Sequence, residues 1–416
     1  RLNCWHRHED FRSVTMANAE AFDAIIIGGG PAGLAAGIVL ARNQLKVLLL
    51  EKHGLPRDKP CGEGIMPTGV ALLDQLGVTN HLNNAELRPF QGISYFGPDG
   101  NIARADFREG VGLGIRRLEL SRALYARACE IPDLEVRTRC TARLMDSDNM
   151  QVSVAVANRI AIAPLVIVAD GLHSPIRRQL QLQERPGSYE RWGARQHFEI
   201  PPWSSDVEVY FSDGLEAYVT PSGPCRVGVA FLWHRDRIKI KGGQALIPEL
   251  LAQFPELERR LQECATSSSM AAIGPLQQRV VRRIRDGVVF LGDAGGYLDA
   301  ITGEGISLAL EGALCLEKTV VPVLKRHRTR PGEVVKVSEL RQFERKTARS
   351  LRRYYRLTGI VLKLSCRPNW SRRVVRALHD NPVVFQHLLS ANMGLVAPWR
   401  LSPTALWRFG WSLIWG

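Results

Sequence analysis

The sequence contains a glycine pattern whose spacing suits the binding of a diphosphate. Gly28, Gly30 and Gly33 stand in the order G-x-G-x-x-G directly after an apolar run, Ala24 to Ile27. In such a pattern the first glycine permits a tight turn, the second lets the backbone approach a pyrophosphate, and the third lets a helix pack closely on a strand. A helix that starts here directs the partial positive charge of its N-terminus at the phosphates. The pattern therefore predicts a dinucleotide site.

A carboxylate stands where the adenosine half of a dinucleotide site needs one. Glu51 follows a second apolar run, Lys46 to Leu50, and lies 23 residues after Gly28. At that place a carboxylate accepts hydrogen bonds from the hydroxyl groups of a ribose. Because NAD and FAD share the adenosine and the pyrophosphate, this half of the site does not distinguish between them.

Two later segments decide between the cofactors. They are Asp170-Gly171-Leu172-His173-Ser174-Pro175-Ile176-Arg177 and Gly292-Asp293-Ala294-Gly295-Gly296, the second continuing to Thr302-Gly303-Glu304-Gly305-Ile306. With the glycine pattern they resemble the three fingerprints of the p-hydroxybenzoate hydroxylase and geranylgeranyl reductase superfamily of flavoproteins, over about residues 22–320. The resemblance implies FAD, with Asp293 accepting hydrogen bonds from the ribitol, a group that NAD lacks. It also implies that the helix opened by Gly303-Glu304-Gly305-Ile306 directs its N–H groups at the pyrimidine edge of the flavin.

A further segment, Arg117 to Leu124, resembles the helix from which an Arg of this superfamily reaches the FAD. Arg117 is the match by register, and Arg116 is the alternative one residue away. Taken alone, Asp170 would also be explained as the N-cap of a helix. The resemblance assigns contacts with FAD to Gly28, Gly30, Pro31, Ala32, Gly33, Glu51, Lys52, Arg117, Asp170, Gly171, Asp293, Gly303, Gly305 and Ile306.

The loop Lys59-Pro60-Cys61-Gly62-Glu63-Gly64 is similar to the Cys-Gly loop of geranylgeranyl reductase-like proteins, which lies beside the isoalloxazine. The aromatic strand motif of those reductases is matched only in part by Tyr218-Val219-Thr220-Pro221, because the Trp between Tyr and Pro is missing. The Trp-x-Trp-x-Ile-Pro segment of flavin-dependent halogenases does not occur in the sequence. Halogenation is therefore the less favoured activity.

No catalytic acid or base stands out. His197 and Tyr218 lie on expected strands of the substrate sheet. Each is either a structural residue of the core or pocket wall, or a residue that carries a proton in the reaction. Cys61 is either a reactive thiol or a small residue that fits a tight loop. We place Cys61, Glu63, His197 and Tyr218 in the substrate pocket and leave the catalytic residues unassigned.

The resemblance implies an FAD-dependent oxidoreductase. We favour a monooxygenase in which NADPH or NADH binds transiently and reduces the flavin, oxygen forms a C4a-hydroperoxide, and one oxygen atom is transferred to a hydrophobic, aromatic or phenolic substrate. The alternative is a reductase of an isoprenoid or lipid double bond, which consumes no oxygen. A non-enzymatic flavin-binding or membrane-scaffold protein is the third interpretation.

The elements that must position these residues follow from the apolar pattern. Ala24–Ile27, Leu165–Ala169 and Val288–Leu291 are uniformly apolar, and Lys46–Leu50 is apolar after its first residue, which is typical of central parallel strands covered on both faces. A helix is expected to reach Ala41, and another covers about Leu118–Cys129. Alternating patterns predict antiparallel strands on both sides of Gly97-Pro98-Asp99-Gly100 and at Gly193–Ile200, Val207–Phe211, Ala217–Pro221 and Val227–Trp233.

The expected fold class is α/β, with a doubly wound, Rossmann-like FAD-binding domain, an inserted antiparallel β-sheet substrate domain and a C-terminal helical region. We assign 1–20 to an N-terminal extension, 21–85, 108–185 and 275–325 to the FAD-binding domain, 86–107 and 186–274 to the substrate domain, and 326–416 to the helical region. The 416 residues provide enough chain for a large core.

The positive charge is concentrated at one end of the chain. Of the net charge of +14, residues 341–416 carry +12, from 14 Lys and Arg against Glu344 and Asp380, together with five of the nine Trp. A near-neutral main body argues against nucleic acid as a partner. The basic end is either a solvated face on a helical bundle or a contact surface for a membrane.

Eight Cys without CxxC spacing indicate free thiols in a reducing compartment, which predicts a cytoplasmic protein that associates with a membrane if the basic end binds one. Cys4, His6 and His8 alternate as metal ligands do, but a chain terminus holds such a site poorly, and no metal is expected.

Overall fold

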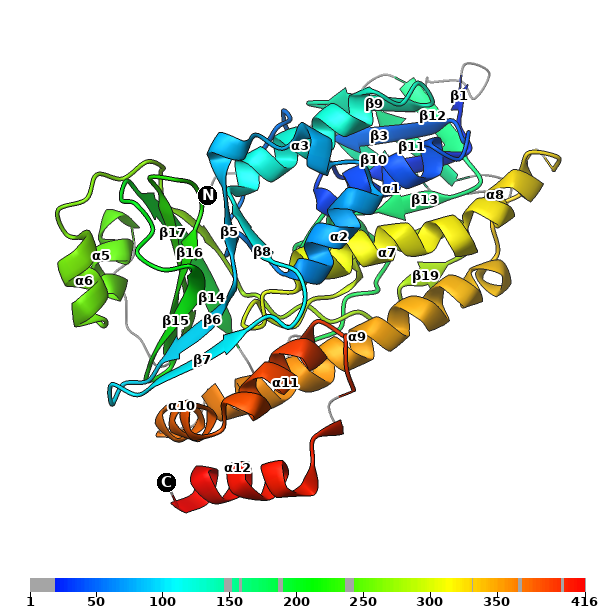
Figure 1. Ribbon diagram of the computed structural model, residues 1–416. Coiled ribbons are helices and arrows are strands. Elements are labelled where there is room, and N and C mark those ends of the chain that lie inside the picture. Colours follow the sequence, from blue (N-terminus) through cyan, green and yellow to red (C-terminus); the bar gives the residue numbers. More distant parts are fainter. Residues whose placement is uncertain are drawn as a thin grey trace, which may run out of the picture.

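The computed structural model describes residues 19–145, 152–156, 159–185, 190–235, 243–330, 332–365, 369–397 and 400–415. Its central sheet has six strands in the order β19-β20-β13-β2-β3-β9, and every neighbouring pair except β19–β20 is parallel (Figure 1). Its strands are β2 (Ala24–Ile27), β3 (Val47–Glu51), β9 (Leu134–Thr138), β13 (Val166–Val168), β19 (Ile284–Arg285) and β20 (Val288–Phe290). The apolar runs of the sequence form this buried parallel core, as predicted.

Each face of the parallel sheet carries its own hydrophobic core. On one face lie the helices α1 (Pro31–Ala41), α3 (Arg117–Cys129) and α7 (Gly305–Thr319), with α2 (Pro67–Gln75) beside α7. The other face is covered by a four-stranded sheet and the short helix α4 (Pro175–Gln179). That sheet consists of β1 (Glu20–Ala21), β10 (Ala142–Leu144), β11 (Val152–Val156) and β12 (Arg159–Ala163). The chain thus crosses from β9 to β13 through strands, where a doubly wound sheet usually has a helix.

A seven-stranded sheet, which we call the substrate sheet, forms beside this domain in the order β18-β14-β17-β16-β15-β6-β7 (Figure 1). Its strands are β6 (Gly92–Phe96), β7 (Ile102–Asp106), β14 (Arg191–Phe198), β15 (Asp206–Ser212), β16 (Leu215–Pro221), β17 (Val227–His234) and β18 (Ala271–Ile273). Two separate insertions join in it, because β15 pairs in parallel with β6. The helices α5 (Leu246–Leu251) and α6 (Pro255–Leu261) cover one face.

A small sheet links the two units. Its strands are β4 (Gly64–Ile65), β8 (Gly112–Ile115) and β5 (Leu87–Phe90), and β8 pairs with both neighbours. The loop that contains Cys61 enters this sheet directly at Gly64. It therefore lies between the parallel core and the substrate sheet.

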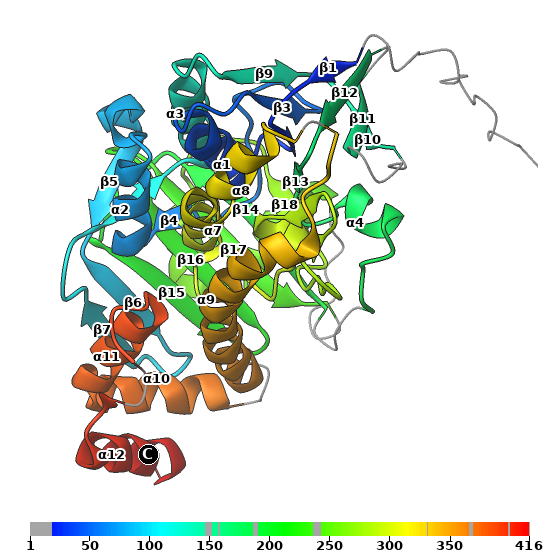
Figure 2. The same cartoon turned by 90° about the vertical axis from the view of Figure 1, so that its right-hand side faces the viewer.

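The C-terminal helices pack across both units. They are α8 (Val321–His327), α9 (Val337–Ser365), α10 (Trp370–Asp380), α11 (Pro382–Asn392) and α12 (Pro403–Trp415). The long helix α9 lies against α7, α10 and α11 pack on β7, and α12 packs on α10 at the outer end of the molecule (Figures 1 and 2). None of the helices in the described ranges combines the length and the hydrophobicity needed to cross a bilayer.

Candidate active site

The glycine pattern forms a tight turn between β2 and α1 with one open face. Gly28 has a φ of +112°, and a Cβ there would lie 2.2 Å from the carbonyl oxygen of Ala169. A Cβ on Gly33 would lie 1.8 Å from the carbonyl oxygen of Gly28. By contrast, a Cβ on Gly30 would have no atom within 4 Å. Two glycines are thus required by packing inside the protein, and the third leaves backbone accessible to a ligand.

Glu51 ends β3 and holds the glycine turn from the side. Its Oε2 accepts a hydrogen bond from the Gly29 backbone N–H at 2.7 Å, and its Oε1 accepts one from the His53 N–H at 2.9 Å. The carboxylate is buried, whereas the neighbouring Lys52 is exposed. Since each carboxylate oxygen has two lone pairs, these bonds leave acceptor capacity for a ribose. Its contact with the ribose stays a prediction, as do those of Pro31 and Ala32 in the first turn of α1.

Asp170 follows β13 and is not the N-cap of α4. That cap is Ser174, whose Oγ accepts the Arg177 N–H at 3.0 Å. The Oδ1 of Asp170 is buried and has no hydrogen-bond partner among the described residues. Burial raises the pKa of this carboxyl group. A buried acceptor without a partner is expected where a ligand supplies the donor.

The charges of Asp293, Arg117 and Lys59 converge on one position, where Arg117 is buried and the other two are half-buried. Burial raises the pKa of Asp293, and the positive charges of Lys59 and Arg117 oppose that rise. Arg117 begins α3, and its buried Nη1 has no partner among the described residues. Arg116, the alternative in the sequence, instead places its Nη2 4.0 Å from Asp58. This arrangement favours Arg117 as the residue that faces the cofactor.

Two charged side chains of the site have no assigned role in the sequence analysis. Lys59 Nζ lies 3.7 Å from the position that a Cβ on Gly171 would take. Burial lowers the pKa of the Lys59 ammonium group. The buried Arg177 donates to the carbonyl oxygens of Leu172 at 2.7 Å and Ala294 at 2.9 Å. It thereby ties the second fingerprint to the third. The sequence signal for Arg177 is its place within the second fingerprint, but its partners lie on another loop.

The third fingerprint opens α7 and is covered by the C-terminal helices. Gly303 has a φ of +69°, and a Cβ there would meet no atom within 4 Å. Gly305 begins α7, and Ile306 packs partly buried against the core of the parallel sheet. From α11, Asn392 donates to the Thr302 carbonyl at 3.2 Å and to Glu304 Oε1 at 3.3 Å. Burial raises the pKa of Glu304 to about 7.

These features together fit FAD. The open backbone at Gly30 suits the pyrophosphate, the partnerless atoms of Asp170 and Arg117 need polar ligand groups, and the N-terminus of α7 suits an electron-rich ring edge. When bound, FAD supplies the transfer of two electrons, which the side chains of the protein cannot supply.

The Cys-Gly loop is fixed to the substrate sheet by a buried charged network. Glu63 has a φ of +61°; its Oε1 accepts the Arg117 N–H at 2.8 Å, and its Oε2 lies 2.5 Å from His197 Nε2. Arg195 donates from Nη2 to Asp58 Oδ1 at 2.7 Å. Glu63 and His197 thus contact each other and anchor the loop, and their contact with a substrate stays a prediction.

The loop places Cys61 near Arg117 and near Tyr297, which belongs to an apolar cluster. Burial, followed by the negative charge of Glu63, raises the pKa of the Cys61 thiol, and the charge of Arg117 opposes this rise. Tyr218 lies in the cluster and donates from its hydroxyl to the Ile301 carbonyl at 3.2 Å. The cluster is formed by strands of the substrate sheet and the segment after β18, by the second and third fingerprints, and by α9. It contains Leu172, Tyr218, Leu232, Ile273, Leu276, Tyr297, Leu298, Ala300, Ile301, Val361 and Leu362.

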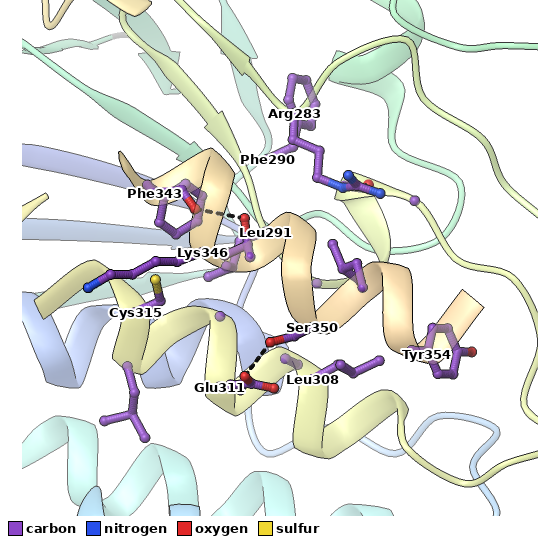
Figure 3. Close-up of a pocket in the computed structure, with 18 of the residues that line it drawn as sticks. Arg283, Phe290, Leu291, Leu308, Glu311, Cys315, Phe343, Lys346, Ser350 and Tyr354 are labelled. Carbon is purple, nitrogen blue, oxygen red and sulfur yellow. Dashed lines mark hydrogen bonds between the residues drawn. The ribbon is translucent and has the colours of Figure 1, made fainter. Parts of the chain in front are cut away.

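A cavity of about 320 Å³ lies between α7 and α9 (Figure 3). Its lining extends from Phe343 and Lys346 on α9 to Asp293 and Gly305 of the third fingerprint. Ser350 crosses the cavity to donate a hydrogen bond to Glu311. The cavity therefore borders the cofactor position from the side of the C-terminal helices.

Cysteine chemistry elsewhere is limited in the described ranges. The six cysteines in the described ranges are free thiols. The His, Cys, Asp and Glu side chains of the described residues form no cluster suited to a metal ion. The Cys4, His6 and His8 pattern lies outside the described residues.

Replacing Asp293 by alanine is expected to change cofactor affinity and protein stability in opposite directions. Loss of a charged acceptor weakens FAD binding by roughly 1.5–3 kcal/mol, about 10- to 150-fold. In the FAD-free protein, burial raises the pKa of Asp293, so its ionised form costs stability at pH 7. The variant apoprotein is therefore more stable than wild type at pH 7, and this gain disappears once the pH falls below the ordinary pKa of an Asp. FAD titration by flavin fluorescence and urea unfolding at several pH values measure both effects.

Replacing the exposed Asp133 by alanine is the matched control and is expected to change neither quantity. Wild-type FAD affinity in the Asp293→Ala variant would show that the third fingerprint is misassigned.

Comparison with known proteins identifies a family. Residues 21–331 match the model of a family described as FAD binding domain. Menaquinone reductase of Mycobacterium tuberculosis is 29% identical over 322 residues, covering 71% of this chain and 76% of that protein. The FAD-dependent monooxygenase cle3 of Aspergillus versicolor is 25% identical over 406 residues (87% and 80%). Digeranylgeranylglycerophospholipid reductase of Methanothrix thermoacetophila is 23% identical over 408 residues (93% and 98%).

Solved structures share the fold. A flavoprotein/dehydrogenase from Cytophaga hutchinsonii has a TM-score of 0.75 at 20% identity, covering 90% of this chain and 93% of that one. The halogenase PltM in complex with phloroglucinol and FAD has a TM-score of 0.72 at 17% identity, covering 94% and 90%. At these identities the likeness concerns the fold, and it agrees with the predicted α/β class.

Proposed function

This chain belongs to the FAD-binding-domain family and is an FAD-dependent oxidoreductase, and from that premise we propose that it reduces a carbon–carbon double bond in a prenylated lipid. Menaquinones, which carry a prenyl chain, are one example of this class of substrate. The sequence alone favoured oxygenation of an aromatic substrate, and reduction was the alternative. The site residues and the relatives named as reductases favour the second chemistry.

The position and protonation of Cys61 carry this proposal. Reduction of a double bond requires a proton in addition to the two electrons and proton delivered as hydride. Burial raises the pKa of the Cys61 thiol, so Sγ is protonated at neutral pH and poorly suited to act as a nucleophile. The same shift makes the thiol a weaker acid, so it gives its proton only to the strongly basic carbon that forms as hydride is added. Its loop is fixed by Glu63, whose Oε1 accepts the Arg117 N–H, and by Arg195, which donates to Asp58; the Glu63 N–H donates to Cys61 Sγ at 3.4 Å.

The apolar cluster supplies the environment that a prenyl group needs. Tyr218, Tyr297 and Ile301 lie in this cluster beside the third fingerprint. Burial raises the pKa of both tyrosines well above its usual range, so their hydroxyl groups stay neutral. An apolar wall excludes water and orients the substrate. NADPH or NADH stays the predicted source of electrons.

Anaerobic turnover tests the proposal. Enzyme whose flavin is chemically reduced without oxygen is expected to be reoxidised on addition of a menaquinone with a prenyl chain. After air has returned the ring to its quinone form, the product is expected still to carry two additional hydrogen atoms by mass spectrometry, which places them in the prenyl chain. Cys61→Ala slows reoxidation by about 100-fold if the thiol is the proton donor. Cys264→Ala removes another half-buried free thiol and serves as the control.

Hydroxylation is the second candidate, since a monooxygenase is 25% identical over 87% of this chain. In that case the reduced flavin is reoxidised only after oxygen is admitted, and the product gains one oxygen atom. This result would overturn the reductase proposal and leave the FAD site as described.

A further inference from the structure

The helix α12 presents apolar side chains on two faces. Phe409 points inward and packs with the cluster that contains Leu378 and Leu389. Outward, Trp407 is 66% exposed, Trp411 is 56% exposed and Ile414 is 58% exposed. Spacings of four and three residues bring these three side chains onto one face of the helix. A helix on the surface of a soluble protein normally has polar residues there.

We name the outward set Leu406, Trp407, Trp411 and Ile414 the α12 face. The rings of Trp407 and Trp411 stack with centroids 5.7 Å apart, so the two indoles form one continuous apolar surface. Figures 1 and 2 place α12 at the outer end of the molecule, beyond α10. The α12 face therefore has room to meet a large flat partner.

The charge around this face is positive. Residues 370–416 contain five Arg and a single acid, Asp380, which gives +4. Asp380 accepts a hydrogen bond from Ser412 Oγ at 3.1 Å. Exposed arginines lie on α10, at the start of the segment that leads into α12, and on α12 itself: Arg372, Arg373, Arg400 and Arg408.

The helix α9, which contacts α10 and α11, also carries positive charge. Arg341, Arg345, Arg349, Arg352 and Arg356 are all exposed and recur every three or four residues. That spacing places them along one face of α9. Such a stripe attracts anionic surfaces over about a Debye length, ~10 Å at 0.1 M salt.

We propose that the α12 face docks this protein on an anionic lipid bilayer. The side chains of Trp407, Trp411 and Ile414 enter the boundary between the lipid headgroups and the acyl chains, and the surrounding arginines bind lipid phosphates. A second copy of this chain fits less well, because a symmetric pair of α12 faces brings like charges together. Docking is independent of the reaction at the flavin site.

Sedimentation of the FAD-loaded, full-length chain with vesicles tests this docking. We expect binding to phosphatidylcholine vesicles that contain phosphatidylglycerol, weaker binding to pure phosphatidylcholine, and loss of binding between ~0.1 M and ~1 M salt. The triple variant Trp407→Ser, Trp411→Ser and Ile414→Ser is expected to bind on the order of 30-fold more weakly. In the double variant Arg400→Gln and Arg408→Gln, the affinity for anionic vesicles is expected to fall about fivefold for each arginine removed.

Control variants separate docking from general hydrophobicity. Ile102→Ser and Val281→Ser remove exposed apolar side chains on other elements and are expected to bind vesicles as wild type does. FAD content of the triple variant reports its folding. Three outcomes overturn the proposal: no binding to anionic vesicles, equal binding by the triple variant, or a concentration-dependent dimer that the triple variant abolishes while vesicles bind neither protein.

Discussion

Gly30→Val is expected to weaken FAD binding on the order of 100-fold in a protein that still folds. A Cβ on Gly30 has no protein atom within 4 Å, so the valine side chain is accommodated without a clash in the FAD-free chain. The same open space is where the pyrophosphate approaches the backbone. Overpacking of this kind costs up to about 3 kcal/mol, which corresponds to a loss of affinity of the order of 100-fold. Flavin fluorescence titration and thermal unfolding of the apoprotein measure the two effects separately.

Gly359→Val on α9 is the matched control, because a Cβ there also meets no atom within 4 Å and the residue lies outside the fingerprints. We expect it to keep wild-type FAD affinity. A yellow, flavin-replete Gly30→Val protein would contradict the placement of the phosphate loop. An unfolded one would contradict the open space found at Gly30.

The cofactor half of the site could be predicted from the sequence because its residues lie in short, contiguous segments. Gly28 to Gly33 needs only a strand before it and a helix after it, and the structure provides β2 and α1 at those places. Glu51 and Asp293 likewise stand at the ends of strands that the apolar pattern identifies. The ends of parallel strands meet at one edge of a sheet, so local patterns determine which residues converge there.

The substrate side could not be predicted to the same depth, because its contacts join distant segments. Glu63 and His197 are 134 residues apart, and nothing in either local sequence identifies the other as its partner. The role of Asn392 depends on how α11 packs against the third fingerprint, which depends in turn on β7. The strands that cover the second face of the parallel sheet were also not predicted. The sequence of residues 134–163 has no helix-like pattern, but it also does not indicate which strands pair with one another.

The buried network around Arg195 is expected to make a large contribution to the stability of the protein. Arg195 is 1% exposed. It donates to Asp58 Oδ1 and to the Lys59 carbonyl, and its Nε lies 3.7 Å from Glu63 Oε1. Arg195→Met keeps most of the side-chain volume but leaves the Glu63 carboxylate buried without this cation. Removal of one partner from a buried charged network costs about 3–5 kcal/mol.

We expect urea unfolding of Arg195→Met to show this loss in the free energy of unfolding. Arg159→Met is the control: Arg159 pairs with Glu20 at 3.1 Å, but its side chain is 73% exposed, so the change is expected to stay below about 1 kcal/mol. A similar stability for both variants would mean that the network contributes no more than a surface pair.

A double variant separates the effect of buried charge from that of packing. If Arg195→Met destabilises because Glu63 keeps an unbalanced charge, then adding Glu63→Gln removes that charge while it preserves the shape of the side chain. The double variant is then expected to regain about 1–2 kcal/mol relative to Arg195→Met alone, which is a coupling energy typical of residues in one network. If instead packing dominates, the two losses add, and the double variant is less stable than either single variant.

Because Glu63 also accepts the Arg117 N–H, the same variants report whether the Cys-Gly loop and the cofactor position are coupled. FAD affinity is expected to fall with Glu63→Gln and to change little with the Arg159→Met control.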